Sequence, residues 1–116
     1  MKLDAWKQAH LLALDLYECA KRMPPRHRGH LGADLCSDAL AIPSRIAFGS
    51  AAVKDADACE ALESAILSAR MVQVELCLAR DLGCVPAKEA DRLFERAEEV
   101  RNLIWKQLEK RGEKLS

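Results

Sequence analysis

The sequence predicts an all-α protein, an antiparallel up-and-down four-helix bundle with a kinked second helix. The composition favours helices, since it is rich in Ala and in charged residues, with few Gly and Pro. Only 4% of the 116 residues are aromatic, so the core must consist of Leu, Ile, Val and Ala. Apolar residues recur at alternating three- and four-residue steps, the spacing of one helix face. Short segments with Gly and Pro separate these stretches, as connections between antiparallel neighbours do. We expect one domain, residues 1–116.

The helical spacing defines four stretches, each about twenty residues long. They cover about residues 4–23, 31–48, 57–82 and 87–110. Asp4 is a candidate N-cap of the first helix, and Asp55 or Asp57 is a candidate N-cap of the third. Gly49 is expected to end the second helix in the left-handed conformation. Residues 82–86, Leu-Gly-Cys-Val-Pro, combine a Gly terminator with a Pro initiator between the last two helices.

Prolines set further boundaries. Pro24 and Pro25 end the first helix, because proline lacks the backbone donor and excludes α geometry from the residue before it. Pro43 lies inside the second helix, where it removes the hydrogen bond to the Ala39 carbonyl at a cost of about 3 kcal/mol. We therefore expect a kink or a local break there, with Ser44 or a water bonding the freed backbone groups.

The third helix carries two apolar stripes. The first contains Leu62, Ile66, Ala69, Val72, Leu76 and Ala79. The second, on nearly the opposite side, contains Leu67, Met71, Val74 and Leu78. An ordinary surface helix has one apolar stripe, toward its own core. We expect the second stripe to be an interface in a homo-oligomer. The alternative is a helix buried centrally within one bundle, which would cover both stripes.

Basic residues gather around the first connection. The chain has 18 basic and 18 acidic residues, a balance that does not indicate binding of nucleic acid or an anionic membrane by the whole surface. Arg22, Arg26 and Arg28 lie at the first connection, and Arg45 lies in the second helix. They are candidates for contacts with an anion or RNA phosphates. The alternative is a structural role, since cations complement a helix C-terminus.

No arrangement of residues indicates an active site. His27 and His30 form a His-x-x-His without a third ligand at a convincing spacing, so we expect no metal and no cofactor. Cys36 near His30 is the least unlikely nucleophile–base pair, and we expect no catalysis from it. The five cysteines have long spacings and no Cys-x-x-Cys. They are interpreted as small buried residues in a reducing compartment, the alternatives being a disulfide framework or a zinc site.

Nothing in the sequence indicates a membrane. The first residues have no apolar signal-peptide core behind them, and no uncharged run approaches the ~20 residues needed to span a bilayer. We expect a soluble cytoplasmic protein whose main partner is itself. The alternative partner is RNA or a nucleic-acid enzyme, although the chain has no aromatic platform and no glycine-rich loop for base recognition.

Residues 39–50 read Ala-Leu-Ala-Ile-Pro-Ser-Arg-Ile-Ala-Phe-Gly-Ser. This stretch resembles the central motif of the four-helix-bundle proteins encoded by intervening sequences within bacterial large-subunit ribosomal RNA genes, commonly small-apolar-Ser-Ile-Pro-Ser-Asn-Ile-Ala-Glu-Gly. The resemblance extends to Trp6, to the Pro-rich link and to residues 79–83. It implies an up-and-down bundle that assembles into a homopentameric ring. It also implies the fold of the accessory variability protein of diversity-generating retroelements, a basic pentameric barrel that binds nucleic acid and a reverse transcriptase.

The chain also departs from the family pattern. Arg45 and Phe48 stand where the family usually has Asn and Glu, and Met71 and Gln73 stand where its third helix usually carries two Glu. If those acids perform a task in common members, this protein lacks the groups for it. Met71 also extends the second apolar stripe, which favours a drier interface.

Overall fold

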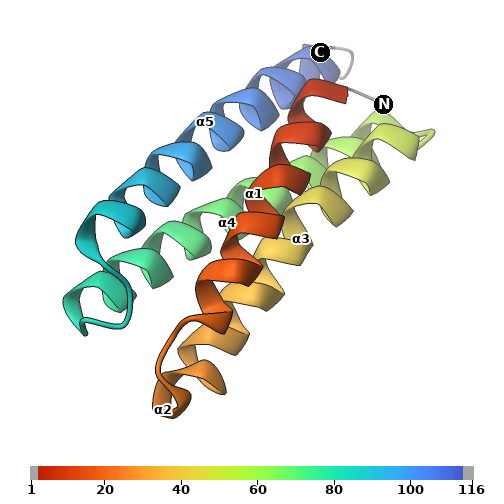
Figure 1. The fold of residues 1–116 in the computed structure, drawn as a ribbon. Coiled ribbons are helices and arrows are strands. Elements are labelled where there is room, and N and C mark those ends of the chain that lie inside the picture. Colours follow the sequence, from red (N-terminus) through yellow and green to blue (C-terminus); the bar gives the residue numbers. More distant parts are fainter. Residues whose placement is uncertain (1–2, 114–116) are drawn as a thin grey trace.

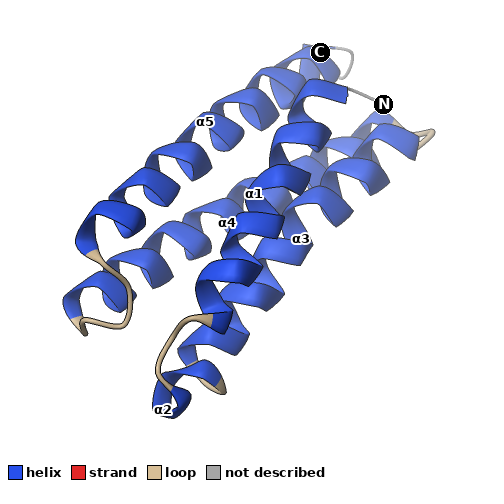
Figure 2. Ribbon diagram, in the orientation of Figure 1, coloured by secondary structure: helices blue, strands red, loops and turns tan. Residues whose placement is uncertain are grey.

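The computed structural model describes residues 3–113, which form a bundle of helices with no strand in that range (Figures 1 and 2). The helices are α1 (Leu3–Lys21), α2 (Pro25–Arg28), α3 (Leu31–Ala51), α4 (Asp55–Asp81) and α5 (Ala87–Gly112). The predicted all-α bundle is confirmed. The single turn of helix α2, within the basic connection, was not predicted.

The four long helices pack side by side in a bundle of 47 × 22 × 20 Å. Helix α1 packs against α3 and α5, and α4 packs against the same two helices. Helices α1 and α4 therefore lie at opposite corners, as Figure 1 shows with α1 in front and α4 behind. In that view the chain descends through α1, rises through α3, descends through α4 and rises through α5, so that α1 begins at the same end of the bundle as α5 ends.

Aliphatic side chains from all four long helices fill the core. The largest fully buried ones are Leu12, Leu16, Met23, Leu35, Ile42, Ile46, Leu62, Val72, Leu76, Leu93 and Ile104. Each such side chain stabilises the fold by about 1.5–3 kcal/mol relative to an exposed one. The first stripe of the third helix belongs to this core, and only Ile66 is partly exposed. Its predicted burial is confirmed.

The predicted N-caps are wrong. Helix α1 begins at Leu3, so Asp4 lies within its first turn. Helix α4 begins at Asp55 after Lys54, whose side chain makes no capping hydrogen bond, and Asp55 and Asp57 both lie in the first turn. Carboxylates in a first turn still interact favourably with the helix dipole, by about 0.3–1 kcal/mol each.

The predicted role of Gly49 is also wrong. Helix α3 continues to Ala51, and Gly49 lies buried inside it without a positive φ. A Cβ at Gly49 would lie 3.2 Å from the Ala58 carbonyl oxygen and 3.2 Å from Leu62 Cγ. Glycine is therefore needed here because α3 and α4 approach closely, and not because the chain turns.

Gly83 ends α4 as predicted. Its φ is 75°, and its N–H donates to the Arg80 carbonyl at 3.0 Å. The next N–H, of Cys84, donates to the Ala79 carbonyl at 2.9 Å. These two hydrogen bonds form a Schellman motif, which bonds carbonyls left free at the helix end and favours glycine at the left-handed position.

The predicted local break at Pro43 is wrong, because residues 31–51 form one uninterrupted helix. Pro43 is buried between Ile42 and Ile46, and the packing of this apolar face compensates for the hydrogen bond that proline removes. The Ser44 hydroxyl donates to the Leu40 carbonyl at 2.8 Å, and so does not bond the carbonyl that Pro43 frees. The kink stays a prediction.

Candidate functional site

The most unusual surface feature is the second apolar stripe of α4. We call Leu67, Met71, Val74 and Leu78 the α4 stripe. Their exposed fractions are 66, 46, 52 and 49%. They stay exposed because α4 packs mainly against α3 and α5, and the described residues leave its outer side uncovered. The alternative of a central helix with both stripes covered by its own chain is therefore wrong.

A polar network borders the α4 stripe on the side of α5. Gln73 is 1% exposed, and its Nε2 donates to Glu98 Oε1 at 2.9 Å and to the Phe94 carbonyl at 3.3 Å. Arg70 donates to Gln73 Oε1 at 3.2 Å, and Arg101 donates to Glu98 at 2.7 Å. The hydrogen bond from Gln73 and the two arginines lower the pKa of Glu98. Gln73, one of the departures from the motif, therefore joins α4 to α5.

A buried acid borders the stripe on the side of α3. Glu75 is 7% exposed, and its Oε1 accepts no hydrogen bond from the described residues. Burial, a hydrogen bond with Asp38 and the negative charges of Asp38 and Asp34 raise the pKa of Glu75 to about 9. Glu75 therefore keeps its proton at neutral pH. Helical spacing places Glu75 between the two apolar stripes of α4, beside Ser64 and Ser68. It cannot show that α3 covers this side of α4 and brings two further carboxyl groups to it.

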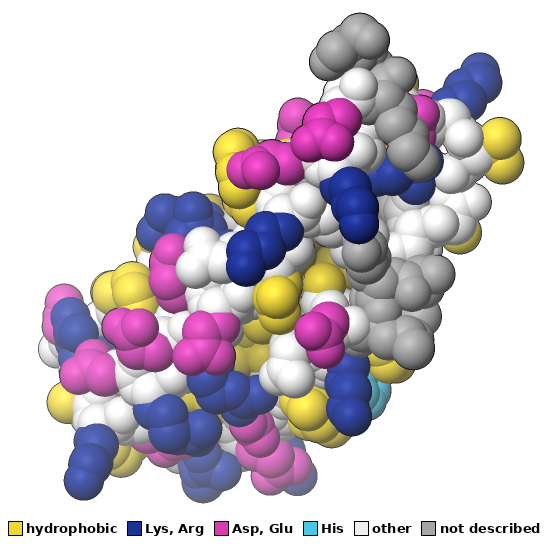
Figure 3. Space-filling model, turned by 90° about the horizontal axis from the view of Figure 1, so that it is seen from above, with side chains coloured by type: hydrophobic (Ala, Val, Ile, Leu, Met, Phe, Trp, Pro, Cys, Tyr) yellow, Lys and Arg dark blue, Asp and Glu magenta, His cyan; other side chains and the backbone are white. Residues whose placement is uncertain are grey.

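The four candidate arginines do not form one patch. Arg22 forms an ion pair with Glu89, and Arg28 donates to the Met23 carbonyl at 3.2 Å, both near the α1–α2 connection. Arg26 also lies there, in α2. Arg45 lies about 21 Å along α3 from its start and donates to Ser64 Oγ at 2.5 Å. On the face drawn in Figure 3, acidic and basic side chains are intermixed.

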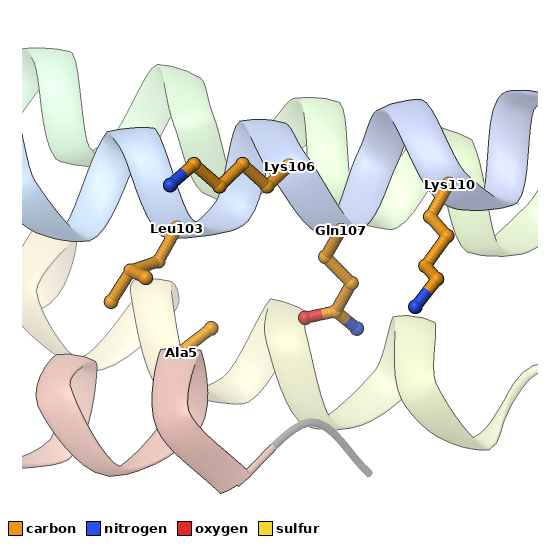
Figure 4. A pocket seen from close by; sticks show the side chains of 5 residues that line it. All are labelled: Ala5, Leu103, Lys106, Gln107 and Lys110. Atoms are coloured by element: carbon orange, nitrogen blue, oxygen red, sulfur yellow. The ribbon is translucent and has the colours of Figure 1, made fainter.

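Two of the surface hollows lie between neighbouring helices. One, of about 230 Å³, lies between α1 and α5 and is lined by Ala5, Leu103, Lys106, Gln107 and Lys110. Figure 4 shows Gln107 and Lys110 extending from α5 toward it. Gln107 Nε2 donates to Ser50 Oγ at 3.1 Å, while its buried Oε1 has no partner among the described residues. The sequence analysis did not predict the burial of Gln107. Its position beside the apolar stripe of the last helix was the observation that could have indicated it.

The second hollow, of about 410 Å³, lies between α3 and α4. Its lining is Arg45, Phe48, Asp57, Glu60, Ala61 and Ser64. It contains Arg45 and Phe48, two of the departures from the family pattern, together with the carboxylates of Asp57 and Glu60.

The cysteines are free thiols, so the disulfide alternative is wrong. Cys19, Cys59 and Cys84 are buried, whereas Cys36 and Cys77 are partly exposed. Burial raises the pKa of Cys19 to about 11 and also raises that of Cys36. A raised pKa is the opposite of what an activated thiolate needs, which weakens the pairing of Cys36 with a base.

Within residues 3–113, no group of three or more His, Cys, Asp or Glu side chains is placed to hold a metal ion. The helices of the same range contain no segment long and apolar enough to cross a membrane.

The comparison with protein families agrees with the motif in α3. The model of the family described as 23S rRNA-intervening sequence protein matches residues 1–106, from α1 into α5. The chain belongs to this family. A comparison of this intervening-sequence protein with curated proteins found no match.

In α3 of this intervening-sequence protein, residues that match the motif and residues that differ from it have different exposure. The residues that match and are buried are Ile42, Pro43, Ile46 and Gly49. By contrast, Arg45 is exposed and Phe48 is 64% exposed. The matching residues therefore pack in the core and allow the close contact with α4. The differing residues Arg45 and Phe48 change the outer surface.

Proposed function

We propose that this intervening-sequence protein is a non-enzymatic homo-oligomer that acts as a structural or interaction module, with the α4 stripe as part of its interface. The observation that carries the proposal is the exposure of Leu67, Met71, Val74 and Leu78 along one side of a single helix. Contiguous apolar surface of this kind marks contact sites on soluble proteins. The family resemblance adds a ring of five chains as the expected form, and the free thiols favour the reducing cytoplasm.

The α4 stripe alone is too small to hold an assembly together. Covering a half-exposed Leu, Met or Val side chain contributes about 1 kcal/mol, so the four residues contribute about 4 kcal/mol. Association of two chains costs an estimated 4–15 kcal/mol in lost motional freedom. The interface must therefore include further apolar surface on the facing chain.

Leu78→Glu tests the proposal. Leu78 is 49% exposed in the single chain, so a charge there should leave the helices intact and prevent its burial between chains. Light scattering on a sizing column should give the mass of one chain, 12.9 kDa, with unchanged helical circular dichroism. Val53→Glu is the matched control, because Val53 is 97% exposed in the α3–α4 turn and should keep the assembled mass. An assembly that persists in Leu78→Glu would exclude the α4 stripe as the interface.

The second candidate function is binding of RNA, or service as an accessory factor of a nucleic-acid enzyme. It is favoured by the placement of Arg22, Arg26 and Arg28 at one end of the bundle, where a ring would gather the cations of all copies. Binding would depend on phosphate contacts and fall steeply with salt.

Filter binding of single-stranded RNA at low salt tests this second function. Arg26→Gln with Arg28→Gln should weaken retention, whereas Lys54→Gln, at the other end of α3, should not. Retention no greater than that of a neutral control protein would exclude RNA binding at this site.

A further inference from the structure

A second apolar surface lies on α1. We call Leu11, Leu14 and Tyr17 the α1 stripe, and their exposed fractions are 39, 53 and 41%. They are spaced three residues apart, so they follow one side of the helix. The opposite side of α1 carries core residues such as Leu12 and Leu16, which are fully buried. The α1 stripe is thus, like the α4 stripe, an outer face that its own chain does not cover.

The two stripes point away from each other. Helices α1 and α4 occupy opposite corners of the bundle, each packed against α3 and α5 (Figure 1). The inner side of each helix carries the core residues, so the exposed stripe lies on the outward side of its helix. A two-fold dimer pairs a surface with its own copy, so it covers one stripe and leaves the other exposed. A head-to-tail contact pairs two different surfaces and, when it repeats around a ring, covers both stripes in every chain.

The charges at the ends of the stripes favour the head-to-tail contact. Lys7 and Lys21 lie at the two ends of the α1 stripe. Glu63 and Asp81 lie at the two ends of the α4 stripe, and Glu60 lies one turn before Glu63. Arg70 lies between these acids on the same side of α4, and Asp81 already pairs with Arg80 of its own helix at 3.2 Å, so the acids exceed the bases along this face by one. Glu18 lies between the two lysines on the α1 face, so that face has a small net positive charge and the α4 face a small net negative charge. Pairing α1 with α1, or α4 with α4, brings faces of like net charge together, whereas pairing α1 with α4 brings faces of opposite net charge together.

The spacing of the charges along α1 and α4, and the weakness of the ion pair that Lys21 makes within its own chain, are compatible with a contact between the two stripes. Lys7 and Lys21 are about 21 Å apart along α1, and Glu63 and Asp81 about 27 Å apart along α4, a difference that flexible lysine side chains span. Lys21 pairs with Glu18 of its own helix at 3.4 Å, with both side chains more than half exposed. Such a surface pair is weak and can be replaced at little cost.

We propose that the α1 stripe of a second copy of this chain docks on the α4 stripe, with Lys7 and Lys21 facing the acids at the ends of α4. This inference rests on the proposed homo-oligomer and names the missing half of its interface. It makes the interface heterologous, so the contact that holds the first two chains together leaves an α1 stripe and an α4 stripe free for the next.

Leu14→Glu tests the inference, with Leu40→Glu as its matched control. Leu14 and Leu40 are 53 and 55% exposed, and Leu40 lies on α3, outside both stripes. Light scattering should show the mass of one chain for Leu14→Glu and the full assembled mass for Leu40→Glu. If Leu78→Glu dissociates while Leu14→Glu keeps the assembled mass, the homo-oligomer stands and the α1 contact is refuted. A two-chain mass for Leu14→Glu would show that α4 pairs with α4, and would refute it too.

A charge reversal that leaves the α1 stripe intact provides a second measurement. Lys7→Glu with Lys21→Glu should raise the concentration at which the assembly dissociates about tenfold at low salt, because two favourable pairs become repulsive. High salt should remove most of this difference, since exposed charges are screened. Sedimentation equilibrium measures the dissociation concentration of each protein at low and at high salt. If the double variant and the wild type dissociate at the same concentration at low salt, the charge pairing is refuted. A wild-type chain that is itself a monomer would refute both this inference and the proposed function.

Discussion

Replacing the buried acid Glu75 with glutamine should stabilise the protein above neutral pH. In the folded chain the pKa of Glu75 is raised to about 9 from an ordinary 4.5, first by burial and then by Asp38 and Asp34. Between these two values the unfolded chain releases a proton that the folded chain keeps. Stability therefore falls as pH rises through this interval, and levels off above pH 9.

The expected effect follows from the size of the interval. One pKa unit corresponds to about 1.36 kcal/mol, so the loss contributed by Glu75 between pH 5 and pH 8 is on the order of 4 kcal/mol. A glutamine side chain at this position would have the same size, would not titrate, and could donate to Asp38 through its amide. The free energy of unfolding of Glu75→Gln should thus exceed that of the wild type at pH 8, and the two should converge toward pH 5.

Urea unfolding at pH 5, 6, 7 and 8, at one protein concentration, measures this difference. Groups remote from residue 75 titrate alike in both proteins, so their contributions cancel when the two free energies are subtracted. Glu95→Gln is the matched control, because Glu95 is exposed on α5, outside both apolar stripes, and reports the effect of removing a surface carboxylate. A Glu75→Gln difference that stays constant from pH 5 to pH 8 would refute the reasoning.

Two further predictions concern a helix contact and the thiols. Gly49→Ala should lower the free energy of unfolding by about 1–2 kcal/mol, since crowding of α4 outweighs a helix-propensity gain of about 1 kcal/mol. Gly32→Ala, where the nearest atom to the new Cβ is a methionine sulfur at 3.4 Å, should be neutral or stabilising; equal thermal shifts of the two would contradict this. In native buffer a thiol reagent should label Cys36 and Cys77 before the three buried cysteines, and uniform labelling of all five would contradict the burial.

The long helices were predictable because their signals are local. The inner apolar stripe of α4 and the glycine terminator at Gly83 each depend on residues within a few turns of the same helix. The exposure of the α4 stripe follows from the same periodicity, once four helices share one core. A helical spacing states which side chains share a face, and a bundle buries one face of each helix.

The features that sequence reasoning missed depend on contacts between helices. Gly49 reads as a terminator locally, and only the nearness of α4 explains a glycine inside α3. Pro43 reads as a break, and the buried face around it keeps the helix whole. Glu75 and Asp38 are far apart in the chain, so their meeting and the resulting pKa could not be predicted. Arg45 lies far from the other candidate arginines, which lie at the first connection, because α3 is one continuous helix.

The start of α1 and the end of α5 lie at the same end of the bundle (Figure 1). A short flexible linker could therefore join them, and new termini could be opened at the α3–α4 turn, where Val53 is almost fully exposed. Such a circular permutant would keep every helix contact while reversing the order in which α1 and α5 are synthesised. The bundle thus allows its connectivity to be changed without altering either outward-facing apolar surface.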